Sequence, residues 1–325
     1  MSKMNDAYLV ADDLRAAPGD MTHGFVVVDE SASGVLVRVP TILINGSEPG
    51  PTLMVGSGIH GDDLNTIPMI WRVAAEISPH ELRGKVIAVP VCNPLAFEAG
   101  AHRTPADHKT PSFPGSLQGS VSERMGYHLY HKLVSQADYV LDMHGGSLGS
   151  TLAVLAMVDK GADDDVVEES RLMAEAFGPD LIVMSAPKPG QPPRGMVQVA
   201  GREGKPGVMI GMGQMGFNED DTVRGSEGVI NVMRHIGMLG DSPKVQAPPR
   251  YTSSSVYQYT PLGGTFFPEV DAGQEVETGQ VVGVVRDVFG EQIAEIESEI
   301  DGVVEAIRFY PVIAAGDWVV TVAGF

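Results

Sequence analysis

Two periods of hydrophobic positions alternate along the first two thirds of the chain. Short runs rich in Val and Ile predict buried strands, and apolar residues spaced by three or four positions predict amphipathic helices. Because the two kinds of segment alternate, we expect an α/β fold with a mostly parallel or mixed central sheet and helices on both faces. The predicted strands are 52–55, 85–91, 139–143, 152–158, 181–184 and 206–210. The predicted helices are 64–77, 121–134, 163–176 and 223–239.

The two ends of the chain follow a different pattern. Residues 24–45 alternate strand-like runs around a turn-rich centre, which predicts an N-terminal β-hairpin. After a polar, proline-rich stretch, the remaining sequence has no helical period and carries short Val and Ile runs between glycines. We therefore predict an α/β domain at 1–240, a linker at 241–255 and an all-β barrel or sandwich module at 256–325.

The charge balance restricts the partners of the protein. There are 22 Lys and Arg against 42 Asp and Glu, a formal net charge of −20. Such a surface repels nucleic acid and anionic lipid. Cys92 is the one cysteine, so no intramolecular disulfide can form, and the acidic start lacks the apolar run of a secretory signal. We expect a cytoplasmic protein with no membrane partner, while the sequence leaves open whether it forms a homo-oligomer.

Two glycine-rich motifs suggest chemistry that their surroundings disfavour. Residues 56–61 and 211–216 fit the glycine pattern of dinucleotide-binding turns, but the strand after the first motif ends in Cys92 rather than in the acid that binds ribose. Residues 145–149 fit the nucleophile elbow of serine hydrolases around Ser147, with His235 later in the chain. An elbow leads directly into a helix, whereas the pattern after Ser147 predicts a strand.

A third motif favours a metal site. His60 and Asp63 follow the predicted strand 52–55, and His144 ends the predicted strand 139–143. Since ligands bind beyond the carboxyl ends of parallel strands, these three side chains could converge there. Two histidines and one carboxylate with an open fourth position are typical of catalytic zinc.

The motifs together resemble the succinylglutamate desuccinylase/aspartoacylase family of zinc-dependent deacylases, which is related in fold to the zinc carboxypeptidases. The resemblance extends from about residue 50 to the C-terminus. It depends on the sequences at 58–63, 91–97, 102–105, 113–115 and 142–144, and on the β pattern of the last 70 residues.

The resemblance implies roles for individual residues. His60 and His144 would bind Zn²⁺, and Asp63 stands where the family has a glutamate ligand. Arg103 stands where the family has an arginine that polarises the scissile carbonyl and supports the oxyanion. Asn93 would belong to the substrate site.

Three departures from the family pattern modify these expectations. Asp63 is one methylene shorter than glutamate, so the sequence leaves open whether the site binds zinc or another divalent metal. The Asn-Arg pair that grips the substrate carboxylate is absent, and His108 or Lys109 would substitute for it. Gly211 stands at the position of the catalytic glutamate, so we consider Glu219 as the replacement base.

These features predict a metal-dependent amidohydrolase with altered specificity. It would cleave an amide bond in a small N-acylated or cyclic substrate, as a deacylase does. The alternative is a catalytically reduced member of the family that binds or senses a small ligand, and a serine hydrolase that uses Ser147 ranks third.

Overall fold

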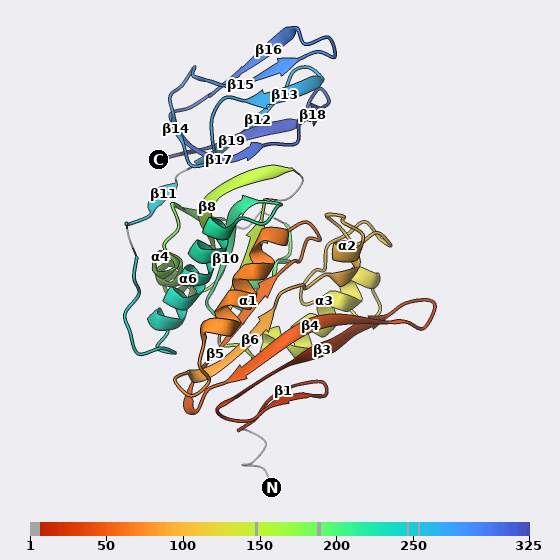
Figure 1. Cartoon of the computed structure of the whole chain (residues 1–325), viewed down its shortest axis with the longest axis vertical. Helices are drawn as coiled ribbons and strands as arrows, with labels where there is room; N and C mark the ends of the chain where they lie inside the picture. The colour runs from red at the N-terminus through yellow and green to blue at the C-terminus, as the bar shows by residue number, and fades with distance from the viewer. Residues whose placement is uncertain (1–6, 147–148, 187–189, 246, 253) are drawn as a thin grey trace.

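The computed structural model describes residues 7–146, 149–186, 190–245, 247–252 and 254–325, and its core is one large mixed sheet (Figure 1). Along the main path, ten strands follow the order β12-β19-β17-β8-β10-β7-β5-β6-β4-β3. Their bounds are β12 Ser254–Tyr259, β19 Trp318–Gly324, β17 Gly302–Arg308, β8 Ser150–Asp159, β10 Gly207–Gln214, β7 Tyr139–Gly145, β5 Glu48–Ser57, β6 Arg83–Val89, β4 Leu36–Asn45 and β3 Asp20–Glu30.

Four neighbouring strands of this sheet run parallel. β6 pairs with β5, β5 pairs with β7, and β7 pairs with β10, so their carboxyl ends meet at one edge. The pairing places Gly56 beside Asp142, and His144 beside Gly211. This edge therefore collects the residues that follow each strand.

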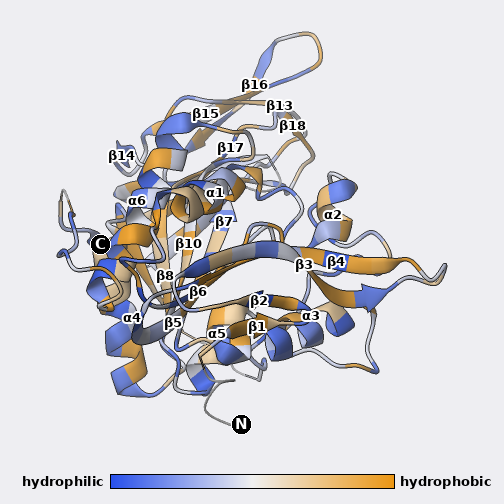
Figure 2. Ribbon diagram, turned by 60° about the horizontal axis from the view of Figure 1, so that its bottom comes forward, coloured by the Kyte–Doolittle hydropathy of each residue, from blue (hydrophilic) through white to orange (hydrophobic). Residues whose placement is uncertain are grey.

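Helices cover both faces of the sheet, as the sequence predicts. On one face, α1 (Ile67–Glu76), α4 (Asp164–Phe177) and α6 (Glu219–His235) bury apolar side chains against the strands. On the other face lie α3 (Val121–Lys132) and α5 (Met196–Arg202). Figure 2 shows hydrophilic and hydrophobic residues alternating along α4 and α6, as expected for helices with one buried face.

The predicted N-terminal hairpin is present as β3 and β4, which extend beyond the body of the sheet (Figures 1 and 2). A shorter hairpin precedes it, formed by β1 (Leu9–Ala11) and β2 (Leu14–Ala16). The predicted helix 64–77 begins as a 3₁₀ turn, η2 (Leu64–Thr66), before α1. Predicted strand 139–143 continues to Gly145, so His144 belongs to the strand itself. The sequence pattern missed α2 (Pro94–Glu98) and α5, which are too short to show a clear period.

The C-terminal residues form an all-β region whose two parts connect differently to the rest. Four strands make a separate antiparallel sheet in the order β16-β15-β13-β18, with bounds β16 Gln292–Glu297, β15 Val281–Arg286, β13 Gly264–Pro268 and β18 Val312–Ile313. The strands β12, β17 and β19 instead extend the large sheet, because β17 pairs with β8. Residues 250–252 of the predicted linker form β11 (Arg250–Thr252), which pairs with β9 (Leu181–Ser185). The proposed domain division stays a prediction.

Among the described residues, no helix combines the length and the apolar character needed to cross a membrane.

Candidate metal centre

The turn between β5 and η2 carries His60 and Asp63. Its backbone is tied to the end of β6, because the carbonyl of Ser57 accepts from Cys92 N (2.8 Å) and that of Gly58 accepts from Asn93 N (2.8 Å). A Cβ at Gly61 would lie 2.2 Å from the carbonyl carbon of Ala96, so only glycine permits this close packing. The turn is therefore a rigid support for its two functional side chains.

β7 supplies His144 on the face of the sheet that carries α3 and α5. Side chains alternate along a strand. Leu141 and Met143 accordingly join the core beneath α1, α4 and α6, whereas Asp142 and His144 lie on the opposite face. Gly145 follows, and its lack of a side chain lets the strand end approach Asp63, whose Oδ1 accepts from Gly145 N at 3.1 Å.

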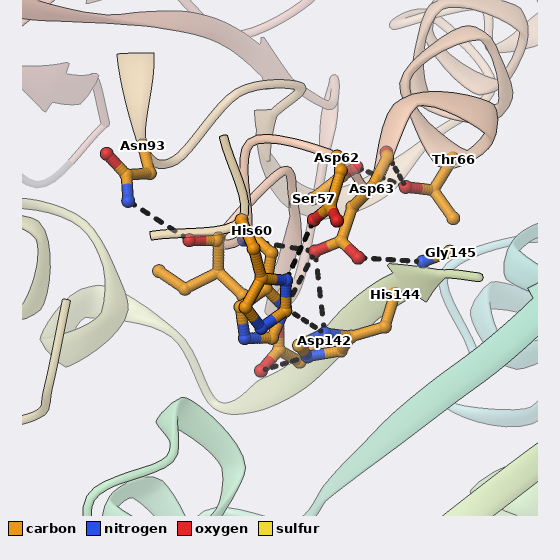
Figure 3. Close-up of polar contacts among 11 residues, drawn as sticks. Ser57, His60, Asp62, Asp63, Thr66, Asn93, Asp142, His144 and Gly145 are labelled. Carbon is orange, nitrogen blue, oxygen red and sulfur yellow. Dashed lines mark hydrogen bonds and ion pairs between the residues drawn. The ribbon is translucent and has the colours of Figure 1, made fainter. Parts of the chain in front are cut away.

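His60, Asp63 and His144 converge as the sequence predicts (Figure 3). One ligand atom from each residue lies within 4.8 Å of the others. The Nδ1 atoms of the two histidines are 3.3 Å apart, and Asp63 Oδ2 lies 3.2 Å from His60 Nδ1 and 3.5 Å from His144 Nδ1. Asp63 is fully buried. Two imidazole nitrogens and a carboxylate directed at one point form a donor set that fits zinc.

Asp142 is a functional candidate that the sequence analysis left without a role. Its Oδ2 lies 3.3 Å from His144 Nε2, while its buried Oδ1 has no hydrogen-bond partner among the described residues. A carboxylate on Nε2 leaves Nδ1 of His144 free for a metal, which is the usual support of a histidine ligand. The period of two along a strand could have found it, because Asp142 must share a face with His144.

The electrostatics of the metal-free cluster favour a charged His144. Burial lowers the pKa of His144, but the adjacent carboxylates of Asp142 and Asp63 outweigh burial and raise this pKa to about 9. The two carboxylates thus stabilise a positive charge at this position. A metal ion would replace the proton.

The cluster lies at one side of a cavity of about 450 Å³ with a cationic wall. Arg103, His108 and Lys109, which the sequence predicts as oxyanion and substrate residues, line it. So does Arg194, which the sequence analysis missed because it lies in a loop without any motif. Among the described residues, no hydrogen bond or ion pair engages the guanidinium groups of Arg103 and Arg194. Lys109 lies 3.5 Å from Glu123, which lines the same cavity.

Asn93 and Glu219 do not line this cavity. Asn93 is fully buried, its amide donates to the carbonyl of Ile59 (3.3 Å), and its Oδ1 caps α2. It supports the turn that carries His60 instead of facing a substrate. Glu219 begins α6, where its side chain is 79% exposed and lies 3.5 Å from Arg72. This position gives Glu219 no contact with the cavity.

Gly211 places no side chain on the cluster face of β10, and the space beside it is filled by leucine side chains. It is paired with His144 on the adjacent strand and follows Met209, which lines the cavity. A Cβ at Gly211 would lie 3.2 to 3.3 Å from side-chain atoms of Leu152 and Leu155. The position that carries a glutamate in the resembled family therefore faces the site side of the sheet without a carboxylate.

Ser147 lies outside the described residues. The described chain on either side of it belongs to β7 and β8, two strands, so the helix of a nucleophile elbow is missing. His235, the proposed partner of Ser147, ends α6 and lies 3.0 Å from Glu169.

Comparison with known proteins decides the family. The model of the succinylglutamate desuccinylase/aspartoacylase catalytic domain matches residues 49–236. The chain belongs to this family. It is accordingly an amidohydrolase of the deacylase type, acting on carbon–nitrogen bonds other than peptide bonds. A curated relative, N-alpha-acetyl-L-2,4-diaminobutyric acid deacetylase from Halomonas elongata, is 30% identical in an alignment of 317 positions that covers 93% of this chain and 91% of the relative.

Solved structures share the fold of this family member. The product-bound structure of the ectoine utilization protein EutE (DoeB) from Ruegeria pomeroyi has a TM-score of 0.84 at 22% identity, covering 95% of this chain and 97% of that one. A succinylglutamate desuccinylase/aspartoacylase from Rhodobacter sphaeroides has a TM-score of 0.82 at 24% identity, covering 94% and 95%.

Proposed function

We propose that this protein is a zinc-dependent deacylase that removes the acyl group from a small N-acylated amino acid. The observation that carries the proposal is the His60, Asp63 and His144 cluster beside a cavity whose wall is cationic. The three side chains would hold zinc. When bound, the metal supplies a Lewis acid that polarises the amide and lowers the pKa of a water molecule towards about 7.

The cationic wall supports an acylated amino acid as substrate. An N-acylated amino acid has lost the positive charge of its acylated amine but keeps its carboxylate. Arg194 and Lys109 supply cations for that carboxylate, and a guanidinium offers two parallel N–H donors for it. Arg103 lies on the same wall and would stabilise the negative charge that develops on the amide oxygen.

Within this class we favour an N-acetylated diamino acid, the substrate named for the Halomonas elongata relative. Such a molecule carries a free ammonium group in addition to the carboxylate. Glu123 also lines the cavity; its Oε2 accepts from Ser120 N and lies 3.5 Å from Lys109, and its Oε1 can accept from that ammonium group. An N-succinyl amino acid carries a further carboxylate instead, which Glu123 would repel.

The test is a turnover assay with a matched substrate set. Purified protein is loaded with zinc and offered N-α-acetyl-2,4-diaminobutyrate, N-acetylaspartate, N-succinylglutamate and a lactam, and the released acid and amine are quantified. We expect hydrolysis of the acetylated diamino acid at the highest kcat/KM and its loss after chelation. Hydrolysis that persists without metal would contradict the proposal.

The absence of a carboxylate at Gly211 favours a second candidate, a member that binds the same ligand with little turnover. Proton transfer by a positioned carboxylate typically contributes about 10²–10⁴-fold in rate, and Gly211 cannot provide it. Ligand-induced thermal stabilisation of the protein, combined with no measurable product from any of the four compounds, would support this candidate over the deacylase.

A further inference from the structure

A third histidine lies against the proposed metal ligands without contributing a ligand atom to them. The His102 ring stacks on the His60 ring with centroids 4.1 Å apart and an interplanar angle of 8°. Its Nδ1 lies 2.9 Å from Asp62 Oδ1, so the imidazole donates to that carboxylate. Both side chains are largely buried, with 17% of His102 and 8% of Asp62 exposed.

Adjacent carboxylates on the turn serve different histidines. Asp63 points to His60, His144 and Gly145, whereas Asp62 holds His102. The pairing of Asp62 with His102 lies outside the ligand cluster but is in direct contact with one of its rings.

The segment that carries His102 is fixed to the turn by its backbone. Gly61 N donates to the carbonyl of His102 at 3.4 Å, and a Cβ at Gly61 would lie 2.3 Å from the carbonyl oxygen of Ala101. Thr104 is fully buried, and its Oγ1 accepts a hydrogen bond from Asn93 Nδ2 at 3.1 Å. The chain is therefore fixed on both sides of His102. The same segment brings Arg103 to the cavity wall.

We propose that His102, held by Asp62, is a positioning residue that fixes the plane of the His60 imidazole and thereby strengthens metal binding. The inference rests on the proposed function, because it assumes that His60 is a ligand. The χ2 torsion of a histidine has broad, roughly two-fold preferences, so the plane of an unsupported ring varies. A ring stacked almost parallel on one face restricts that rotation, so less freedom is lost when a metal binds.

The electron densities of the two rings should also favour this stack when a metal is bound. A bound metal withdraws electrons from the His60 ring, whereas the hydrogen bond to Asp62 makes the His102 ring richer in electrons. An electron-rich ring stacked on an electron-poor one is favourable. Outer partners of metal ligands typically change metal affinity by about 10–100-fold when they are mutated.

The experiment compares four variants of the full-length chain by zinc affinity. His102→Ala removes the ring, His102→Phe keeps a ring without the bond to Asp62, and Asp62→Asn keeps an acceptor without its charge. His131→Ala is the matched control, since the His131 ring lies against the Tyr127 ring on α3, with centroids 4.2 Å apart and an interplanar angle of 50°, outside the site. Zinc dissociation constants come from competition with a chromophoric chelator, and the absorption spectrum of the cobalt-loaded protein reports the geometry of the ligands.

We expect His102→Ala to weaken zinc binding by about tenfold or more and to shift the cobalt spectrum. His102→Phe and Asp62→Asn should weaken binding less, and His131→Ala should match the wild type. The inference is overturned if the wild type binds zinc and His102→Ala binds it within twofold with an unchanged spectrum. If His102→Ala does not fold, wild-type affinity in both His102→Phe and Asp62→Asn overturns it. A wild type that binds no zinc would remove the proposed function, and this inference with it.

Discussion

The ends of β7 and β10 lie side by side in the same sheet, on the same face and in register, yet they carry opposite chemistry. On β7, Asp142 and His144 supply a charged, supported ligand. On β10, the adjacent positions hold Met209 and Gly211, which offer no ionisable group. The side chains proposed to hold a metal are thus all present, while the adjacent strand, where the family resemblance led us to expect a carboxylate, has none. The two halves of such a site can change independently, because each strand end contributes its own side chains.

The sharpest way to test this contrast is to restore the carboxylate. Gly211→Glu should raise kcat for the acetylated diamino acid by about 10²-fold, provided that Leu152 and Leu155, which would lie 3.2 to 3.3 Å from the new Cβ, repack to admit the rest of the side chain. Steady-state kinetics measure the effect. Gly211→Gln is the control, as it adds the same bulk without a base. Equal kcat values for both variants would show that a carboxylate at position 211 does not contribute to catalysis.

Protonation of His144 should make the proposed metal binding depend on pH. With the pKa of His144 near 9 in the metal-free protein, a metal must displace that proton, so zinc affinity should rise up to tenfold per pH unit between pH 7 and 9. Chelator competition at several pH values measures this rise. A zinc affinity that stays flat over the same range would show that His144 is already neutral.

The same group links pH to the stability of the metal-free protein. The pKa of His144 is raised on folding, from its ordinary 6.5 to about 9. Its contribution to stability is therefore complete below pH 6.5 and is lost as the pH rises through 9. We expect a decrease in the free energy of unfolding on the order of 3 kcal/mol over this window, measured by denaturant titration. The His144→Gln variant should show a smaller decrease.

Asp142→Asn tests whether β7 depends on its second carboxylate. The amide keeps the shape but loses the charge that supports His144 Nε2, so zinc should bind about tenfold more weakly. Zinc competition measures the change, with Glu169→Gln, at the acid beside His235, as the control. A zinc affinity within twofold of the wild type would show that Asp142 does not support His144 as a ligand.

The smallest effect is expected at Glu219. Its side chain is 79% exposed and contacts Arg72 rather than the cavity, so Glu219→Gln should change kcat by less than twofold and stability by less than about 0.5 kcal/mol. A large loss of kcat would mean that Glu219 does act as the base.

The sequence predicted the elements and the ligand cluster for a physical reason. Buried strands leave a local apolar pattern, and the carboxyl ends of parallel strands share an edge, so His60 and His144 could be expected at the same edge of the sheet. Contacts between segments far apart in the sequence leave no such pattern. The sequence near Asn93 does not indicate that its amide donates to the turn at Ile59, and the sequence near Arg194 does not indicate that its loop faces the cavity. The pairing of β17 with β8 is equally invisible, since it joins segments about 150 residues apart.

The most direct test of the whole account is the zinc content of the purified protein, measured by elemental analysis beside the His60→Ala and His128→Ala variants. His128 lies on α3, outside the cluster. We predict about one zinc per chain in the wild type and in His128→Ala, and less than a tenth of that in His60→Ala. Less than half a zinc per chain in the wild type after loading, or an unchanged content in His60→Ala, would contradict the account.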